Sequence, residues 1–400
     1  MEAESCEKLL LEAVNGDSRR ERISIDDAWG RVCAETVYAP FMVPPFPKSA
    51  MDGYAVKAEE IKNAARECPV KLTVAGELCA GDFALYDRKP MTAVRVMTGA
   101  PVPEGFDAVV RQEDTDYGQE TVSVYRPVAP YTNYCKAGED ITEGQCVVER
   151  GVRLTSVHIG LLASLGVAYV EAVKPFQTAV IATGSELCAP GEKLGPGQIY
   201  DSISHMLCSS IRREGLALSG AWICADEEEL FLSRLREACS KADVVITVGG
   251  VSVGKKDIVP LVLKKLGARE IFRGVDIQPG TPTMASILGD TVILSLSGNP
   301  YAALAHFQLF FWPLAAKLMG SRDFLPRRET AVFSGEYAKV NKRRRLLRAL
   351  AAEGHVELPS GIHASSVIHN LADCNCFIDL EAGRCLHQGD TVKIRYFKGE

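Results

Sequence analysis

Residues 244–257, which read VVITVGGVSVGKKD, constrain the fold more than any other stretch of the chain. The apolar, β-branched run predicts a buried strand, and the glycines after it allow a tight turn into a helix. Such a turn can also bring backbone N–H groups and the positive end of a helix dipole to an anion. The stretch therefore predicts either a turn that binds nothing or a site for a phosphate or another oxyanion.

The stretch lies within residues 175–322, where predicted strands and helices alternate. We predict strands at 178–182, 216–224, 244–248, 271–275 and 292–296, and helices at 202–214, 227–241, 258–266 and 300–318. This alternation is typical of a parallel sheet with helices on both faces, a three-layer α/β/α domain. Pro313 predicts a kink or a break in the last helix.

The remaining residues predict further domains, because 400 residues exceed what one ordinary hydrophobic core organises. Residues 1–40 and 142–174 predict an N-terminal helix and a connector domain. Residues 41–141 predict a β-rich domain, and residues 323–400 a small β-barrel-like domain. Together with the α/β region, these parts make a multidomain α/β protein.

Composition excludes several classes of function. The net charge of −6 disfavours nucleic-acid binding. Thirteen cysteines without a CxxC motif, after a start that is no signal peptide, predict free thiols in a reducing cytoplasm. Because no apolar run approaches the length of a membrane-spanning helix, no membrane partner is expected.

Polar or glycine-rich sequence follows four of the predicted strands of the α/β region. These strand ends are residues 183–186, 225–226, 249–254 and 297–300. In open α/β sheets, ligands bind outside the carboxyl ends of the strands. The four ends are therefore expected to meet at one edge of the sheet, with backbone N–H groups and Ser252 beside the ligand.

This edge would also gather Glu186, Asp226 and Asp257. Carboxylates that converge on a phosphate-like ligand need their repulsion relieved, most simply by Mg²⁺. Mg²⁺ and the nearby Lys255 and Lys256 would stabilise charge at phosphorus. Taken alone, Asp226 and Asp257 would be helix caps, and the convergence of the strand ends favours the functional interpretation.

Residues 342–345 form a basic run of one lysine and three arginines, with Arg348 shortly after it. A solvated turn is the default interpretation of such a run. Together with Arg348, which lies two residues past Leu346, the run is also a candidate anion clamp at a domain interface.

A series of short motifs runs along nearly the whole chain. The motifs are SAMDGYAV at 49–56, TGAPVP at 98–103, GEDI at 138–141, TGSEL at 183–187, GQIYD at 197–201, GGVSVG at 249–254 with Asp257, and GNP at 298–300. In this combination and order, the chain closely resembles the molybdopterin molybdenumtransferases, the molybdenum insertases related to the gephyrin E domain. The pairing of SAMDGYA with GGVSVG is highly specific.

The resemblance implies a four-part elongated subunit and a homodimer. Each active site would lie in the cleft between one subunit's α/β domain and the partner's β-rich domain. The implied transferase takes adenylylated molybdopterin and molybdate, hydrolyses the phosphoanhydride and inserts molybdenum into the dithiolene, with release of AMP and with Mg²⁺ as cofactor. Implied protein partners are the molybdopterin adenylyltransferase and the molybdoenzymes that receive the cofactor.

The resemblance also implies roles for individual residues. The implied catalytic residues are Asp52, Glu186, Asp226 and Asp257, and the last three of these also hold the metal. The implied cofactor-binding residues are Thr98, Asp140, Thr183, Gly184, Ser185, Asp201, Gly249, Gly250, Ser252, Gly254, Arg273, Asn299, Pro300, Arg348, Ser365 and Ser366.

The chain departs from the family pattern where the oxyanion should bind. The family usually has a basic residue and PGKP after the fourth strand of the α/β domain, whereas residues 273–282 here read RGVDIQPGTP. Arg273 keeps one positive charge, but Gln278 and Thr281 lose two, and Ser297 replaces a proline. The alternative functions are therefore a non-catalytic carrier or scaffold for the cofactor, or a tungstate-inserting paralogue.

Overall fold

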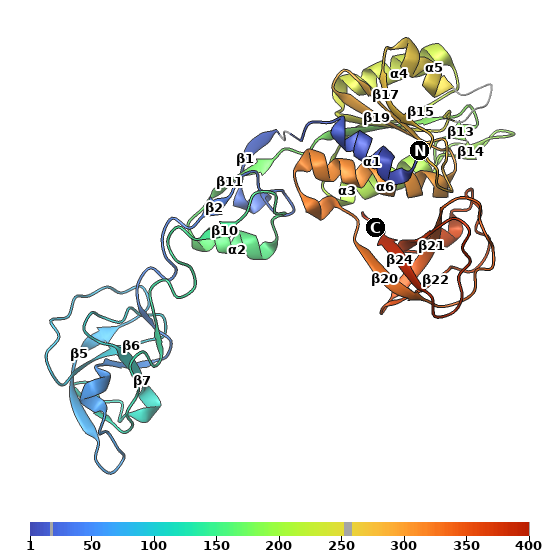
Figure 1. Cartoon of the computed structure of the whole chain (residues 1–400). Helices are drawn as coiled ribbons and strands as arrows, with labels where there is room; N and C mark the ends of the chain where they lie inside the picture. Colours follow the sequence, from blue (N-terminus) through green and yellow to red (C-terminus); the bar gives the residue numbers. More distant parts are fainter. Residues whose placement is uncertain (17–18, 252–257, 400) are drawn as a thin grey trace. The chain divides into compact units, whose positions relative to one another are not determined.

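The computed structural model describes residues 1–16, 19–251 and 258–399 (Figure 1). The described residues divide into two units. The first unit contains Met1–Glu35, Arg150–Ser156 and Tyr169–Glu400, and the second contains Thr36–Glu149 and Val157–Ala168. Each unit has its own core and is described separately.

A six-stranded sheet, built wholly from described residues, forms the centre of the first unit in the order β15–β12–β16–β19–β18–β17. Its strands are β12 (Gln177–Thr183), β15 (Ala217–Cys224), β16 (Val244–Val248), β17 (Arg269–Arg273), β18 (Met284–Leu288) and β19 (Thr291–Leu296). The strands β15, β12, β16 and β19 pair in parallel, as predicted. In contrast, β18 pairs antiparallel with both β19 and β17.

The strand β18 was not predicted from the sequence. Gly289 and Asp290 form a two-residue turn between β18 and β19, across which Leu288 pairs with Thr291. Gly289 has a φ of 61°, which such hairpin turns require and which glycine adopts readily. A prediction based on alternating strands and helices misses this hairpin because no helix lies between its strands. The sheet is therefore mixed, and β18 separates β17 from β19.

Helices cover both faces of this sheet (Figure 1). The helices are α1 (Ala3–Glu12), α3 (Ile203–Arg213) and α6 (Pro300–Met319) on one face, and α4 (Glu228–Lys241) and α5 (Ile258–Lys265) on the other. The alternation of side chains along β16 explains both cores, since Val244 and Ile246 pack toward α3 and α6 while Val245 packs toward α4 and α5. The predicted three-layer α/β/α domain is confirmed.

The helix α6 is buried on nearly all sides, with every residue from Tyr301 to Ala315 buried. The sequence predicts a kink or a break at Pro313, but the helix is not broken there. It continues to Met319 and is capped by Gly320, which has a φ of 60°. Packing on all sides stabilises a helix that loses one backbone hydrogen bond at proline.

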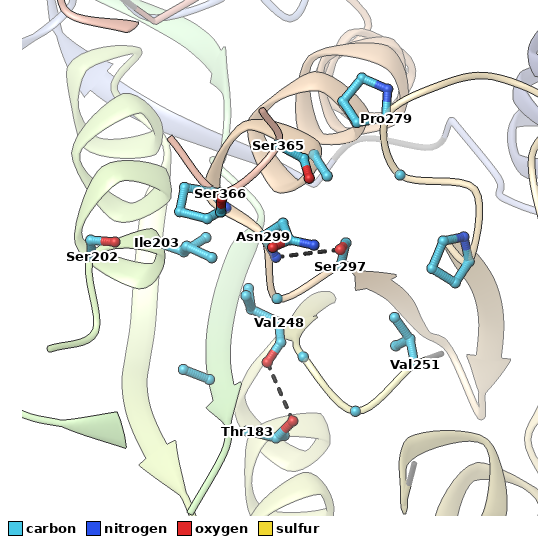
Figure 2. A pocket seen from close by; sticks show the side chains of 18 of the residues that line it. Thr183, Ser202, Ile203, Val248, Val251, Pro279, Ser297, Asn299, Ser365 and Ser366 are labelled. Carbon is cyan, nitrogen blue, oxygen red and sulfur yellow. Dashed lines mark hydrogen bonds between the residues drawn. The ribbon is translucent and has the colours of Figure 1, made fainter. Parts of the chain in front are cut away.

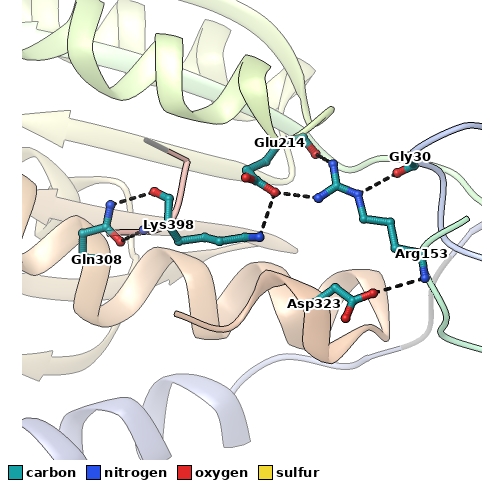
Figure 3. Close-up of polar contacts among 6 residues, drawn as sticks. All are labelled: Gly30, Arg153, Glu214, Gln308, Asp323 and Lys398. Carbon is teal, nitrogen blue, oxygen red and sulfur yellow. Dashed lines mark hydrogen bonds and ion pairs between the residues drawn. The ribbon is translucent and has the colours of Figure 1, made fainter. Parts of the chain in front are cut away.

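A polar cluster attaches other segments of the first unit to α6 (Figure 3). Arg153 Nη1 lies 2.6 Å from Glu214 Oε2, and Arg153 Nε donates to the carbonyl oxygen of Gly30 at 2.9 Å. Lys398 Nζ lies 3.1 Å from the same oxygen of Glu214. The backbone of Lys398 also exchanges two hydrogen bonds of 2.8 Å with the buried side chain of Gln308 in α6. The C-terminal segment is thereby fixed to the helix.

The C-terminal part of the first unit is a closed barrel, which confirms the predicted β-barrel. Its strands are β20 (Arg328–Phe333), β21 (Arg345–Ala352), β22 (His355–Glu357), β23 (Cys376–Leu380) and β24 (Thr391–Tyr396). The barrel joins the α/β domain where β21 begins. There Gln278 N donates to Arg344 O at 2.9 Å, and Leu346 N donates to Gln278 O at 2.8 Å.

Two short strand pairs complete the first unit. They are β1 (Arg20–Ser24) with β11 (Tyr169–Val173), and β13 (Leu187–Cys188) with β14 (Ile199–Tyr200). Among the helices of the described residues, none is both long enough and apolar enough to cross a bilayer.

The second unit is rich in β-structure, as predicted. Its main sheet has the order β7–β4–β6–β5–β8. The strands are β4 (Gly53–Val56), β5 (Val70–Leu78), β6 (Thr92–Val96), β7 (Ala108–Arg111) and β8 (Thr121–Val124), and the smaller elements are β2 (Val37–Tyr38), β3 (Lys48–Ser49), β9 (Tyr134–Cys135), β10 (Cys146–Val148) and α2 (Ser156–Ser164). The motif at 49–56 therefore forms a turn that leads into β4, an interior strand between β7 and β6.

His306 anchors the segment 278–282 to α6. Its Nε2 lies 2.7 Å from the carbonyl oxygen of Pro279, and burial lowers the pKa of His306 to about 4. At neutral pH the ring is therefore neutral, and Nε2 must carry the proton that this carbonyl accepts. Gly280, with a φ of 101°, packs directly on the ring, where a Cβ atom would clash with it.

We predict that the burial of the His306 ring makes the stability of the protein sensitive to acid. Because the folded-state pKa of His306 lies below its ordinary value of 6.5, its contribution is complete above pH 6.5. It is lost as the pH falls toward 4, by at most about 1.4 kcal/mol per pH unit. His306→Gln can donate the same hydrogen bond without titrating and should lose this component. Urea unfolding of both proteins between pH 7.5 and 4.5 checks this, and identical pH slopes would contradict it.

Candidate functional site

A cavity of about 920 Å³ opens where the parallel strands of the first unit end. Its wall combines the segments after β12, β15, β16 and β19 with the start of α3 and the segment 278–282 (Figure 2). The C-terminal domain adds Arg345 and part of the segment 365–368. The edge at which the sequence predicts a ligand is therefore hollow.

Glycines allow the floor of the cavity to form. Gly249 and Gly250 have φ values of 89° and 63°. A Cβ atom on Gly249 would clash with the carbonyl oxygen of Thr183, and one on Gly250 would lie 2.9 Å from Thr183 Oγ1. Thr183 Oγ1 in turn donates to Val248 O at 3.3 Å (Figure 2). The ends of β12 and β16 thus approach each other more closely than residues with side chains would permit.

Carboxylates follow β12 and β15. Asp226 N donates to Ser185 Oγ at 3.1 Å, and Ser185 N lies 3.4 Å from Asp226 Oδ2, so these neighbouring strand ends hold each other in place. The exposed side chain of Glu186 lies over Gly184, where a Cβ atom would be 2.6 Å from Oε1. Asp201 is buried and accepts a hydrogen bond from Ser204 N at 3.1 Å, as a residue at a helix start does.

The N-terminus of α6 forms another part of the wall. Asn299 N donates to Ser297 Oγ at 3.3 Å, and Pro300 occupies the first turn (Figure 2). Tyr301 N donates to the carbonyl oxygen of Ser365 at 3.0 Å, which joins the C-terminal domain to this helix end. Because the first turn of α6 contains no acidic residue, its dipole favours an anion in the cavity.

Arg348 supports the wall from behind. Its Nη2 donates to Ala364 O at 2.6 Å, and its Nη1 donates to Val367 O at 2.7 Å and to Asn370 Oδ1 at 2.6 Å. Its guanidinium carbon lies 3.9 Å from the centroid of the Tyr301 ring. The side chain is buried, and burial lowers its pKa. Arg348 therefore fixes the segment that carries Ser365 and Ser366.

The structure brings many of the predicted site residues into the cavity wall. These are Thr183, Glu186, Asp201, Asp226, Gly249, Gly250, Asn299, Pro300, Ser365 and Ser366. Gly184 and Ser185 lie beside the wall in the segment after β12. Ser252, Gly254 and Asp257 lie outside the described residues, as do Lys255 and Lys256.

Two of the predicted basic residues do not line the cavity. Arg348 lies behind the wall, and Arg273 is exposed at the end of β17, which β18 separates from β19. Arg345 lines the cavity instead, although the sequence prediction placed it only in a candidate anion clamp. Its backbone bridge to Gln278 is a long-range pairing, which no local sequence pattern indicates.

In the second unit, Asp52 and Thr98 form a pair. Thr98 donates to Asp52 Oδ1 from both its backbone nitrogen and its hydroxyl group, each at 2.7 Å. The backbone hydrogen bond first, then the hydroxyl and the charge of Arg95, lower the pKa of Asp52. The exposed carboxylate therefore stays ionised at neutral pH. Asp140 is also exposed, and its N–H group donates to Val43 O at 3.0 Å.

The residues present fit a magnesium ion that is shared with a substrate. Across the described part of the chain, no group of three or more His, Cys, Asp or Glu side chains could hold a metal ion. Magnesium, however, usually binds one or two carboxylates together with substrate phosphates and water. Glu186 and Asp226, at neighbouring strand ends in the cavity wall, are carboxylates of this kind.

Comparisons with known proteins agree with this geometry. Models of the MoeA N-terminal region (domain I and II), of a probable molybdopterin binding domain and of the MoeA C-terminal region (domain IV) match residues 1–166, 179–317 and 330–397. The molybdopterin molybdenumtransferase of Haemophilus influenzae is 34% identical over 395 residues, which cover 97% of this chain and 96% of that protein. The molybdopterin molybdenumtransferase of Bacillus subtilis is 34% identical over 388 residues, which cover 95% of this chain and 90% of that protein.

Solved structures give the same result. Two structures of the molybdopterin biosynthesis MoeA protein from Pyrococcus horikoshii have TM-scores of 0.88 and 0.85, at 28% and 26% identity. They match 100% and 99% of this chain and 100% of their own chains. The chain therefore belongs to the MoeA family of molybdopterin molybdenumtransferases, and the family that its motifs predict is confirmed.

We predict that Gly249→Ala destabilises the protein more than Gly267→Ala. Both glycines have positive φ values, so each substitution should cost about 1–2 kcal/mol for backbone conformation. A Cβ atom on Gly267 meets nothing within 4 Å, whereas one on Gly249 clashes with Thr183 O. Urea unfolding measures the difference, and equal losses of stability would show that the strand ends are not packed as described.

We predict that Thr98→Val raises the pKa of Asp52. The substitution removes the hydroxyl hydrogen bond that favours the charged carboxylate, while the backbone bond remains. Thr98→Ser keeps a hydroxyl donor and is the matched control. NMR titration of the Asp52 carboxyl carbon measures the pKa. The prediction fails if the valine variant titrates like the wild type.

Proposed function

We propose that this member of the MoeA family inserts molybdate into adenylylated molybdopterin and releases AMP, which yields the molybdenum cofactor. The observation that carries the proposal is the cavity in which Glu186, Asp226, the glycine floor and the α6 N-terminus meet. Its volume of about 920 Å³ falls within the range of small-molecule sites. Relatives named molybdopterin molybdenumtransferase cover nearly the whole chain, which supports the same reaction.

Each part of the cavity has a proposed role. The backbone at Gly249 and Gly250 lets the pterin phosphate approach closely, and the dipole of α6 stabilises its charge. Ser365 and Ser366 supply hydroxyl donors from the C-terminal domain. Thr183 and Asp201 position the surrounding backbone through their own hydrogen bonds.

Magnesium is the proposed cofactor, held by Glu186, Asp226 and Asp257. When bound, it would neutralise charge on the phosphoanhydride and so ease its hydrolysis. Ser185 holds Asp226 in place for this role, because its N–H group donates to Asp226 Oδ2 and its hydroxyl oxygen accepts from Asp226 N. An acidic wall without such a cation would repel an anionic substrate.

We also propose a homodimer in which Asp52, Thr98 and Asp140 of one subunit serve the cavity of the other. The ionised carboxylate of Asp52, held by two hydrogen bonds, is suited to position a cation or a water molecule at the reacting centre.

The proposed setting is the cytoplasm, because all thirteen cysteines, each within the described residues, are free thiols. The proposed protein partners are the molybdopterin adenylyltransferase and recipient molybdoenzymes.

A second candidate function is a cofactor carrier, or a paralogue that inserts tungstate. The observation that favours it is that Gln278 and Thr281, both uncharged, line the cavity where the resemblance leads us to expect basic residues. A carrier would bind the pterin without releasing AMP, and a tungstate enzyme would release AMP with tungstate rather than molybdate.

We predict that AMP release depends on molybdate, Mg²⁺ and Asp226. Asp226→Asn removes a proposed metal ligand and should slow AMP release at least about 100-fold. Asp290→Asn makes the same charge change in the exposed turn before β19, at the strand end away from the cavity, and should leave the rate unchanged. Pterin binding without AMP release would favour the carrier, and repeating the assay with tungstate separates the remaining alternative.

We predict that inactive variants of the two units complement each other in a mixed dimer. If Asp52 serves the partner's cavity, a dimer of Asp52→Asn with Glu186→Gln retains one site with both wild-type residues. Random mixing should then restore about a quarter of the wild-type rate. Rates measured after the two variants are unfolded and refolded together test this. No recovery, although mixed dimers form, would place both residues in a site within one subunit.

A further inference from the structure

The described side chains of the cavity wall carry a net negative charge, although the proposed ligands are anions. Three carboxylates line it, those of Glu186, Asp201 and Asp226. Among the lining residues that the structure describes, Arg345 is the only one with a positively charged side chain, so the formal charge of these groups is 1 − 3 = −2. A ligand such as molybdate carries two negative charges and needs a cationic partner in this wall.

The backbone of Arg345 is fixed beside the segment 278–282. Arg345 begins β21 and forms a parallel bridge with Gln278. The N–H group of Gln278 donates to Arg344 O at 2.9 Å, and that of Leu346 donates to Gln278 O at 2.8 Å. His306 Nε2 donates to the carbonyl oxygen of the following residue, Pro279, at 2.7 Å. Backbone hydrogen bonds thus fix the position from which the Arg345 side chain reaches the cavity wall.

The other arginines near the start of β21 are already engaged. Arg343 Nε lies 3.3 Å from Asp276 Oδ1. Arg344 Nε and Nη2 lie 2.6 and 2.5 Å from the Asp379 carboxylate, and its Nη1 lies 2.7 Å from Glu4 Oε1. Arg348 donates to the 364–370 segment, as described above.

Arg345 has unused donors, and among these four arginines it is the one that lines the cavity. Within the described residues it forms no ion pair, and its buried Nε has no hydrogen-bond partner. Among the described residues, its side chain donates one long hydrogen bond, of 3.3 Å from Nη1 to Asn341 Oδ1. A guanidinium offers five N–H donors, and leaving buried donors unsatisfied costs free energy. The arrangement therefore fits a ligand that supplies acceptor oxygens.

We propose that Arg345 binds the tetrahedral oxyanion substrate in this cavity. Its planar guanidinium donates two parallel hydrogen bonds to two oxygens of the oxyanion, a geometry that a lysine cannot reproduce. Gln278 and Thr281 line the same part of the wall without adding charge, so the arginine is the cationic partner there. This inference rests on the proposed function, because it names the residue that binds one of its two substrates.

The test compares Arg345→Gln, Arg345→Lys and the matched control Arg343→Gln. The glutamine variant should raise the KM for molybdate at least about tenfold and leave the dissociation constant of adenylylated molybdopterin within about twofold. The lysine variant keeps the charge but not the fork, and should fall between the glutamine variant and the wild type. Arg343 lies outside the cavity wall, so Arg343→Gln should behave like the wild type.

Equilibrium dialysis with molybdate alone separates this inference from the proposed function. Molybdate binding that requires Arg345 in a protein that releases no AMP would sink the insertase proposal and retain the role of Arg345. AMP release with equal molybdate affinity in the wild type and Arg345→Gln would overturn the role of Arg345 and retain the insertase. Failure of the wild type to bind molybdate would also overturn it. Circular dichroism of each variant establishes that it is folded.

Discussion

The close approach of the ends of β12 and β16 is the constraint on which the candidate site depends. Gly249 and Gly250 pack so closely against Thr183 that a Cβ atom on either would contact it too closely, and both glycines have positive φ values. This contact brings together the segments that follow the parallel strands, and these segments and the N-terminus of α6 line one cavity. A bulkier residue at this point would push the strand ends apart and take the neighbouring carboxylates with them. The shape of the cavity is therefore determined by backbone packing before any charged side chain contributes.

Charge then determines what the cavity can hold. Its described wall carries more carboxylates than cations, yet the proposed substrates are a pterin phosphate and an oxyanion. Magnesium and Arg345 resolve this conflict in different places: the metal at the ends of β12 and β15, the arginine beside the segment 278–282. That segment is held by α6 through His306 and by the barrel through β21. The barrel thus contributes to binding by fixing the loop and supplying the arginine.

Local patterns in the sequence predicted most of the fold and failed where long-range pairing decides. Apolar runs between glycine-rich turns predicted β12, β15, β16 and β19, and the residues after those strands do line one cavity. The strand β18 was missed because its hairpin interrupts the alternation of strands and helices. Arg273 and Arg348 were predicted to bind the cofactor because of their positions in the motifs. However, β18 separates the strand that carries Arg273 from β19, and Arg348 donates its hydrogen bonds to the 364–370 segment. Only the pairing of Arg345 with Gln278, which depends on the docked barrel, identifies the arginine that remains available.

The central claim, that this cavity binds the oxyanion, is tested most directly by X-ray diffraction from crystals soaked with tungstate and AMP. Tungsten scatters anomalously, so its position can be found without assuming where it binds. The account predicts one strong anomalous peak in the cavity, between the α6 N-terminus and the segment 278–282, within hydrogen-bond distance of the Arg345 guanidinium. A reproducible peak elsewhere, with the cavity containing none, would contradict the account.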